Sequence, residues 1–142
     1  MRETLKLTRR YRFAASHRLH TDAMSPDENA RLYGKCNNPF GHGHDYVLDV
    51  TVVGPVDASG QIVNREALDT LVQEQVLERL DHRNLNCDVP ELRNRVPTTE
   101  NLASVIERML TSHWTLPAAL AGVRISETAR NTFELRTKQT TT

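Results

Sequence analysis

The sequence predicts an α+β domain in which an antiparallel sheet carries two helices on one face. Extended segments stand at both ends of the chain and two helical segments lie between them, so the order is strands, helix, helix, strands. No internal repeat or linker interrupts the 142 residues, and a chain of that length can bury one core. We therefore expect residues 1–142 to form a single domain, with 137–142 as a polar tail.

The first half of the chain is expected to consist of two strands joined by a long loop. Residues 4–19 are predicted to be extended, because apolar side chains share one parity there: Leu5, Leu7, Tyr11 and Phe13. Residues 20–41 contain many polar residues with prolines and glycines, which predicts a loop, and loops of this length are usually functional. Residues 44–53 are rich in β-branched residues and are predicted to be the second strand.

A turn and a helix are expected next. Residues 57–60 carry a turn signal, and a short strand at 61–63 after it would complete a hairpin. A helix is then expected to begin at Asn64 or Arg65, because apolar residues recur at helical spacing as far as Leu80.

A second helix is predicted to begin near Thr99. Thr98 or Thr99 is a suitable N-cap and Glu100 is favourable in the first turn, so these residues can be explained as a helix start alone. Two strands, at 122–128 and 131–136, are expected to close the chain.

Composition and charge argue against several functional classes. The 18 basic and 18 acidic side chains balance and form no basic block, which disfavours non-specific nucleic-acid binding. No apolar run is long enough for a membrane span, and the N-terminal residues lack the apolar stretch of a signal peptide. We therefore expect a cytoplasmic protein without membrane contacts, in which Cys36 and Cys87 stay reduced.

His42 and His44 are the residues that most strongly indicate a metal site. They stand at i and i+2 beside the predicted strand, so both side chains project from one face. That arrangement can bring two imidazole nitrogens to one ion at about 2.0–2.1 Å. His17 or His20 could supply a third ligand, and the pattern alone does not choose between them. His17 could equally be a polar residue at a strand end.

Cys36 precedes this histidine pair and has two candidate roles. The thiol could be a metal ligand, or it could act as a base or nucleophile if a neighbouring histidine or cation lowered its pKa. His82, oriented by Asp81, could be that neighbour. The helix dipole also favours a histidine at a helix C-terminus, and this explains Asp81-His82 without a catalytic role.

Glu127 shares the parity of Val123 and Ile125 in a predicted strand. A carboxylate directed to an apolar face needs a partner, such as a cationic or guanidine-like ligand. Exposure at the edge of the sheet is the alternative, and the sequence leaves both open.

Five motifs in this chain together resemble the 6-pyruvoyl-tetrahydropterin synthase family. They occur in the family's order within residues 11–136, which makes coincidence an inadequate explanation. The motifs are Phe13-Ala-Ala-Ser-His-Arg-Leu19, Gly34-Lys-Cys-Asn-Asn-Pro39 with Gly41-His-Gly-His44, Leu80-Asp-His-Arg-Asn-Leu85, Pro97-Thr-Thr-Glu-Asn-Leu102 and Glu127-Thr128.

The resemblance implies a particular fold and assembly. Members of this family have the tunnelling fold, a four-stranded antiparallel sheet with two helices on one face, and their subunits join their sheets into a barrel. The resemblance further implies a homohexamer built from two trimers, with active sites at subunit interfaces.

The resemblance also implies a zinc site and a catalytic thiol. Carried over by position, His17, His42 and His44 match the ligands of Zn²⁺, which favours His17 over His20 as the third ligand. Cys36 matches the thiol that abstracts a proton from the substrate.

Further residues match the family's substrate machinery. Asp81 and His82 match the pair that polarises the thiol, and the resemblance allows this pair to come from a neighbouring subunit. Glu127 matches the carboxylate that grips the guanidine-like edge of a pterin, aided by Thr98, Thr99 and Glu100.

The activity implied is that of a zinc-dependent lyase. Its substrate would be 7,8-dihydroneopterin triphosphate, and its products 6-pyruvoyl-5,6,7,8-tetrahydropterin and triphosphate. Five residues separate Cys36 from His42, as in the pyruvoyl-forming branch. The alternative is the 6-carboxy-5,6,7,8-tetrahydropterin synthase of queuosine biosynthesis, whose spacing is shorter. A zinc-containing module that binds pterin without catalysis is a remoter alternative, and it leaves Cys36, Asp81 and His82 unexplained.

Overall fold

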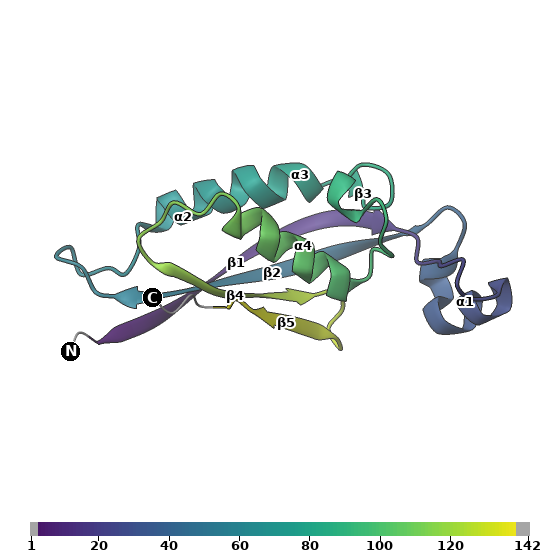
Figure 1. Ribbon diagram of the computed structural model, residues 1–142, viewed down its shortest axis with the longest axis horizontal. Coiled ribbons are helices and arrows are strands. Elements are labelled where there is room, and N and C mark those ends of the chain that lie inside the picture. Colours follow the sequence, from purple (N-terminus) through teal and green to yellow (C-terminus); the bar gives the residue numbers. More distant parts are fainter. Residues whose placement is uncertain (1–2, 139–142) are drawn as a thin grey trace.

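A mixed sheet of five strands runs along the length of the molecule, with helices covering one of its faces (Figure 1). The computed structural model describes residues 3–138. The strands are β1 (Thr4–His17), β2 (His42–Pro55), β3 (Arg83–Asn84), β4 (Ala119–Ser126) and β5 (Thr132–Arg136). They lie in the order β3-β1-β2-β4-β5.

The long strands pair antiparallel and β3 pairs parallel. β1 and β2 are in register over their whole lengths, from Thr4 opposite Pro55 to His17 opposite His42. The two residues of β3 run parallel to Ala15 and Ser16 of β1. The expectation of a four-stranded antiparallel sheet is therefore wrong, because the sheet is mixed and has a fifth strand. A strand of two residues is too short to show an alternating pattern in the sequence.

The two helices that the sequence predicts, α2 and α4, begin at the expected residues. Asn64 accepts a hydrogen bond from the amide of Ala67, and Thr98 accepts one from the amide of Asn101, so both act as N-caps. The first predicted helix is continuous but contains a π-helical turn, η2. The helical segments are α1 (Pro26–Tyr33), η1 (Gly34–Asn37), α2 (Arg65–Val72), η2 (Gln73–Leu77), α3 (Glu78–Leu80), η3 (Pro90–Leu92) and α4 (Thr99–Thr111).

Alternate residues of the central strands form the core. Tyr46, Leu48 and Val50 of β2 are fully buried on the face covered by α2 and α4. The two-residue period of a strand carries this face on to His44 and His42 at the start of β2. The same sheet face that builds the core therefore also carries the histidines.

The composition of residues 20–41 predicts a loop without regular structure. That prediction is wrong, because the segment contains α1 and η1. Ser25 caps α1 by accepting a hydrogen bond from the amide of Glu28, whose carboxylate accepts one from the amide of Ser25. This reciprocal pair is a capping box. Asn29 is the one residue that α1 buries, so no apolar period in the sequence indicates the helix.

The expectation of a hairpin after β2 is wrong. The turn is present, since the amide of Gly60 donates to the carbonyl of Asp57 over 3.0 Å. Residues 61–63 form no strand, however. Val63 is 2% exposed and Ile62 packs beside it, so the apolar pair that suggested a strand packs against the core instead.

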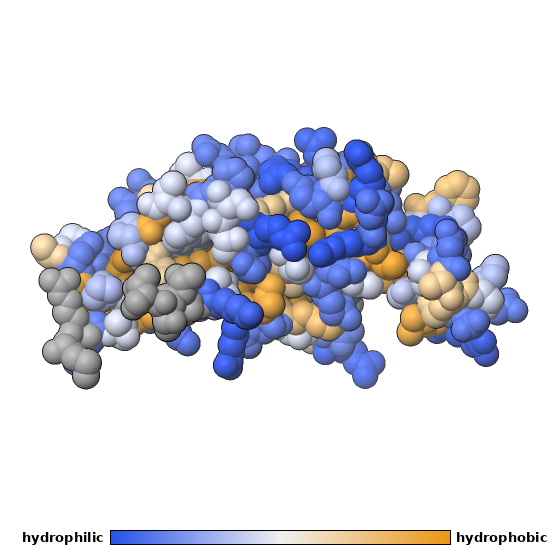
Figure 2. All heavy atoms as spheres, in the orientation of Figure 1, coloured by the Kyte–Doolittle hydropathy of each residue, from blue (hydrophilic) through white to orange (hydrophobic). Residues whose placement is uncertain are grey.

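The surface and the chain end complete the description. No helix within residues 3–138 is long and apolar enough to cross a membrane. Hydrophilic side chains predominate on the face shown in Figure 2, with hydrophobic ones in separate small groups. The amide of Thr137 donates to the carbonyl of Ala121 over 2.9 Å. The remainder of the expected polar tail, residues 139–142, lies outside the described residues.

Candidate metal centre and active site

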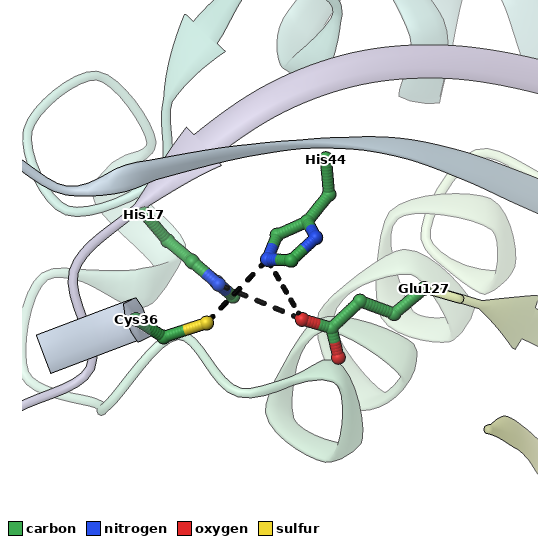
Figure 3. Close-up of side chains that lie close together, drawn as sticks. All are labelled: His17, Cys36, His44 and Glu127. Atoms are coloured by element: carbon green, nitrogen blue, oxygen red, sulfur yellow. Dashed lines mark hydrogen bonds and ion pairs between the residues drawn. The ribbon is translucent and has the colours of Figure 1, made fainter. Parts of the chain in front are cut away.

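Four side chains from separate segments meet where β1 ends and β2 begins (Figure 3). His17 ends β1, His44 stands near the start of β2, Cys36 belongs to η1, and Glu127 directly follows β4. Their nitrogen, sulfur and oxygen atoms all lie within 4.8 Å of one another. This mixture of imidazole, thiol and carboxylate is the donor set of zinc and other transition-metal sites.

The distances within this group are compatible with a shared ion. His44 Nε2 lies 3.5 Å from Cys36 Sγ and 2.9 Å from Glu127 Oε1, and His17 Nε2 lies 3.7 Å from the same carboxylate oxygen. Donors at the corners of a tetrahedron around zinc are about 3.4 Å apart, given metal–ligand lengths near 2.1 Å. These three separations are thus close to those between donors that bind one tetrahedral ion.

His17 is arranged as a metal ligand. Its side chain is fully buried, and its Nδ1 lies 2.8 Å from the carbonyl oxygen of Pro97, to which it donates. A neutral imidazole has one proton, so Nε2 is left as an acceptor. That atom is buried without a hydrogen-bond partner among the described residues. An ion at this position would satisfy it, and the bond from the other ring nitrogen is the usual support of a ligating histidine.

The environment of the two clustered imidazoles, His17 and His44, favours their neutral form. Burial lowers the pKa of both His17 and His44, because desolvation disfavours the imidazolium form. The carboxylate of Glu127 opposes this shift at both rings, and His42 adds to it. Neutral imidazole is the form that binds metal ions, so the environment favours ligation.

His42 lies beside this group but not within it. Its backbone is directly opposite His17, and its ring centroid is 4.7 Å from that of His44. Its side chain is exposed, and its nitrogens are not among the clustered donor atoms. Gly41 brings the chain close to the strand end, since an added Cβ would lie 3.0 Å from the carbonyl oxygen of His17.

Cys36 is a free thiol that lies half-buried against His44. Burial raises the pKa of this thiol, and the nearby carboxylate of Glu127 raises it further. A thiol in this environment is protonated, so it needs an added positive charge to become a base. A bound metal ion would be the largest positive charge at the site.

Glu127 is held by the start of α4. One of its oxygens contacts His44, and the other accepts a hydrogen bond from the hydroxyl of Thr99 over 2.7 Å. Thr99 is 2% exposed, whereas Glu100 is exposed. Thr98 has the role of N-cap that its sequence position indicated. Glu127 follows β4 instead of lying within it, but its side chain still points inward with 16% exposure.

Asp81 and His82 lie apart from the cluster, at the β3 edge of the sheet. Asp81 accepts a hydrogen bond from the amide of Ala14 and lies 3.1 Å from Nδ1 of His82. The side chain of His82 is 82% exposed and its backbone is left-handed, with φ of 60°. It lines a cavity of about 460 Å³ together with Ser16, Asp45 and His44 of the cluster. Within residues 3–138 the structure records no hydrogen bond or ion pair between the Asp81–His82 pair and Cys36.

Tyr46 and Pro97 support the site, and the sequence analysis did not identify them. The hydroxyl of Tyr46 lies 3.4 Å from Nδ1 of His17, and its ring stacks on Phe13. Strand parity from His42 and His44 is the signal that could have indicated Tyr46. Pro97 acts through its carbonyl group, for which the sequence carries no signal.

Comparison with known proteins gives one consistent result. A family model described as 6-pyruvoyl tetrahydropterin synthase matches residues 6–138. The chain is 45% identical over 132 residues to the 6-pyruvoyl tetrahydrobiopterin synthase of Dictyostelium discoideum, covering 92% of this chain and 95% of that one. It is 47% identical over 102 residues to the human protein of the same name, covering 71% and 70%.

Solved structures agree with the sequence relatives. The 6-pyruvoyl tetrahydropterin synthase of Caenorhabditis elegans superposes with a TM-score of 0.89 at 37% identity, covering 97% of this chain and 99% of that one. A Plasmodium vivax structure superposes at 0.73 with 14% identity, covering 96% and 99%, and this likeness concerns the fold alone. The chain therefore belongs to the 6-pyruvoyl tetrahydropterin synthase family.

Proposed function

We propose that this chain is a zinc-dependent lyase that converts 7,8-dihydroneopterin triphosphate into 6-pyruvoyl-5,6,7,8-tetrahydropterin and releases triphosphate. The observation that carries the proposal is the convergence of His17, Cys36, His44 and Glu127 in a member of this enzyme family. A metal site, a thiol and a carboxylate beside one another are the groups that this reaction needs.

We assign the zinc ligands to His17, His42 and His44. The unpaired Nε2 of His17 and the position of His42 directly opposite it support this assignment. Three protein ligands leave a coordination position open, as catalytic zinc sites require. An ion held by these residues would supply Lewis acidity to the hydroxyl oxygens of the substrate side chain, which would make the neighbouring C–H groups more acidic.

The role of Cys36 is that of the base. Its thiolate removes a carbon-bound proton from the substrate side chain, and delivery of a proton to the ring completes an internal redox change without a nicotinamide or flavin. The proximity of Sγ to His44 supports this role, because it places the thiol beside a ligand of the proposed zinc. Asp81 and His82 polarise the thiol from a neighbouring subunit.

The role of Glu127 is to bind the pterin ring. An ionised carboxylate can accept two parallel hydrogen bonds from a guanidine-like edge. The hydroxyl of Thr99 orients this carboxylate, since it donates to the oxygen that does not contact His44. Thr98 and Glu100, which flank Thr99 at the start of α4, are proposed to aid this binding.

The proposed assembly is a homohexamer of two trimers, each closing its sheets into a barrel. Two features support it. Within residues 3–138, the edge of β1 that faces away from β2 is paired only at Ala15 and Ser16, and the outer edge of β5 has no strand partner. Each chain therefore offers two largely free sheet edges for pairing. The second feature is that the structure records no hydrogen bond or ion pair between the Asp81–His82 pair and Cys36 of the same chain, so a pair from a neighbouring chain could take that role.

Product analysis tests the proposed reaction. The purified, zinc-loaded protein is incubated with 7,8-dihydroneopterin triphosphate, and the pterins and inorganic triphosphate are separated by chromatography. We expect 6-pyruvoyl-tetrahydropterin and triphosphate in equal amounts. Stoichiometric acetaldehyde would instead indicate the 6-carboxy-tetrahydropterin reaction. Pterin binding without any release of triphosphate would indicate a binding module.

A further inference from the structure

The position of the Cys36 thiol depends on how η1 is attached to the rest of the chain. Cys36 lies in this short 3-10 turn between α1 and β2, outside the sheet. No strand ladder holds it there, so other hydrogen bonds must fix it. A misplacement of about 1 Å in a catalytic group can lower a rate about 100-fold, so these bonds affect catalysis directly.

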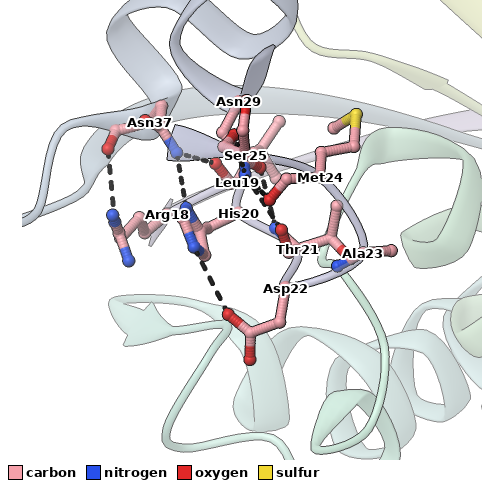
Figure 4. A network of polar contacts seen from close by, with 10 residues as sticks. All are labelled: Arg18, Leu19, His20, Thr21, Asp22, Ala23, Met24, Ser25, Asn29 and Asn37. Atoms are coloured by element: carbon pink, nitrogen blue, oxygen red, sulfur yellow. Dashed lines mark hydrogen bonds and ion pairs between the residues drawn. The ribbon is translucent and has the colours of Figure 1, made fainter. Parts of the chain in front are cut away.

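The attachment is a pair of hydrogen bonds between the backbone of Leu19 and two consecutive residues, Cys36 and Asn37. Figure 4 shows the bond from Asn37. The carbonyl oxygen of Cys36 accepts from the amide of Leu19 over 2.7 Å. The side-chain amide of Asn37 donates to the carbonyl oxygen of Leu19, also over 2.7 Å. The side-chain N–H of Asn37 thus replaces the backbone N–H that a neighbouring strand would supply. Both the amide and the carbonyl group of Leu19 are hydrogen-bonded to this segment.

A second donation from Asn37 strengthens the attachment. The same side-chain nitrogen lies 3.1 Å from Nδ1 of His20, which accepts from it, while Nε2 of His20 faces Asp22 at 3.5 Å. The carbonyl of Asn37 accepts from Nε of Arg18 over 3.2 Å. Every hydrogen bond that the structure records for the Asn37 side chain is therefore a donation.

The backbone that receives these bonds is itself fixed. Asn29 is fully buried and both accepts from the amide of Thr21 and donates to its carbonyl, at 2.9 Å each. The side chain of Asn86 forms the same two-way pair with the backbone of Arg18, at 2.6 and 2.9 Å. The backbone of residues 18–21, which directly follows the proposed ligand His17, is therefore fixed by hydrogen bonds at both of its ends.

We propose that Asn37 is a positioning residue that fixes the Cys36 thiol relative to the metal centre. It does so by tying η1 to Leu19, two residues beyond His17. This inference rests on the proposed function in assigning the thiol a catalytic role. The structural part, that Asn37 holds η1 in place, is independent of the reaction catalysed.

Two neighbouring substitutions test the proposal. Asn37→Asp keeps the shape of the side chain but replaces its donor by an acceptor, so the bond to Leu19 is lost. Asn38→Asp makes the same chemical change one residue later. Asn38 is exposed and its side-chain oxygen accepts from the amide of Phe40 over 3.2 Å, a bond that aspartate retains. The second variant therefore controls for the added negative charge.

Three quantities are measured on the full-length, zinc-loaded variants: kcat and KM, zinc content, and the exchange rate of the Leu19 amide hydrogen. For Asn37→Asp we expect kcat to fall by about 10- to 100-fold while KM and zinc content stay unchanged. The Leu19 amide, which donates to Cys36, should exchange about tenfold faster or more. Asn38→Asp should match the unmodified protein in all three.

Several results would overturn the proposal. One is a kcat for Asn37→Asp equal to that of Asn38→Asp. Another is an unchanged exchange rate of the Leu19 amide hydrogen in Asn37→Asp. The third is a loss of zinc in Asn37→Asp, which would show that Asn37 acts on the metal centre instead. If the unmodified protein releases no triphosphate, the proposed function fails by itself. The exchange rate of Leu19 then still decides whether Asn37 holds the Cys36 segment.

Discussion

His17 donates a hydrogen bond from Nδ1 to the carbonyl oxygen of Pro97, 2.8 Å away. This bond fixes the tautomer in which Nε2 is free to bind a metal ion. Pro97 directly precedes Thr98, the N-cap of α4, and Thr99 in the first turn of that helix donates to Glu127. One helix start therefore orients both a proposed zinc ligand and the proposed pterin carboxylate.

Removal of any proposed zinc ligand is expected to abolish metal binding. His17→Ala, His42→Ala and His44→Ala should each lose most of the zinc that the unmodified protein holds, about one ion per chain, because three ligands are the minimum for a catalytic site. Metal analysis of the purified variants measures this. His20→Ala is the matched control and should keep its zinc. Full zinc content in His42→Ala would show that the ligands are instead those gathered around His17.

Pterin binding should depend on the contact between Thr99 and Glu127. Thr99→Val preserves the shape of a buried side chain but removes its hydrogen bond to the carboxylate. Hydrogen bonds to charged groups contribute about 1.5–3 kcal/mol, so we expect pterin affinity to fall by about tenfold or more. Titration calorimetry with a pterin measures it.

Glu127→Ala complements that experiment. It should lose pterin binding while keeping its zinc, since Glu127 is proposed to bind substrate and not metal. A loss of zinc in Glu127→Ala would make the carboxylate a ligand.

Stability should depend on pH through an ion pair between β1 and α2. Both oxygens of Asp69 accept from the guanidinium of Arg9 at 2.7 Å, and one also accepts from the hydroxyl of Tyr11 at 2.6 Å. The hydrogen bonds from Arg9 lower the pKa of Asp69 below its ordinary value of 3.8. A depressed carboxylate pKa stabilises the fold above the unfolded value, and this contribution is lost as the pH falls through the folded value.

Asp69→Asn tests this contribution. The variant should be less stable than the unmodified protein at neutral pH, by at most about 1 kcal/mol because both side chains are more than a third exposed. The difference should shrink as the pH falls below 3.8. Urea denaturation of both proteins over this pH range measures it. A difference that does not change with pH would mean that packing, not charge, connects the two elements.

The sequence predicts the long elements well because their patterns are periodic. In β1 and β2 apolar residues recur at alternate positions, with Arg9 as a break in β1, and in α4 they recur at helical spacing. All three elements lie where these patterns indicate. α1 was missed because the residue that it buries, Asn29, is polar, so no apolar spacing indicates a helix. Its N-cap, Ser25, is the one signal in the sequence. β3 was missed because it has two residues.

The sequence names candidate residues for the site but does not give their geometry. Strand parity indicates that His42 and His44 share a face, and the family motifs bring in His17, Cys36 and Glu127. Neither reveals that the carbonyl group of Pro97 fixes the tautomer of His17. Every residue has a backbone carbonyl group, so the sequence does not indicate which one accepts this hydrogen bond. The proposed approach of Asp81 and His82 to the thiol of a neighbouring subunit is a contact between chains, which the pattern of one chain does not reveal.

The central claim is that zinc is held by three histidines with an open position, and that Cys36 is a base beside it. Measuring zinc content and turnover together in Cys36→Ala tests this most directly. The account predicts zinc at the level of the unmodified protein and turnover lower by about 10²–10⁴-fold, the usual contribution of a positioned base. A parallel loss of zinc would make Cys36 a ligand, and the site would then be closed and structural.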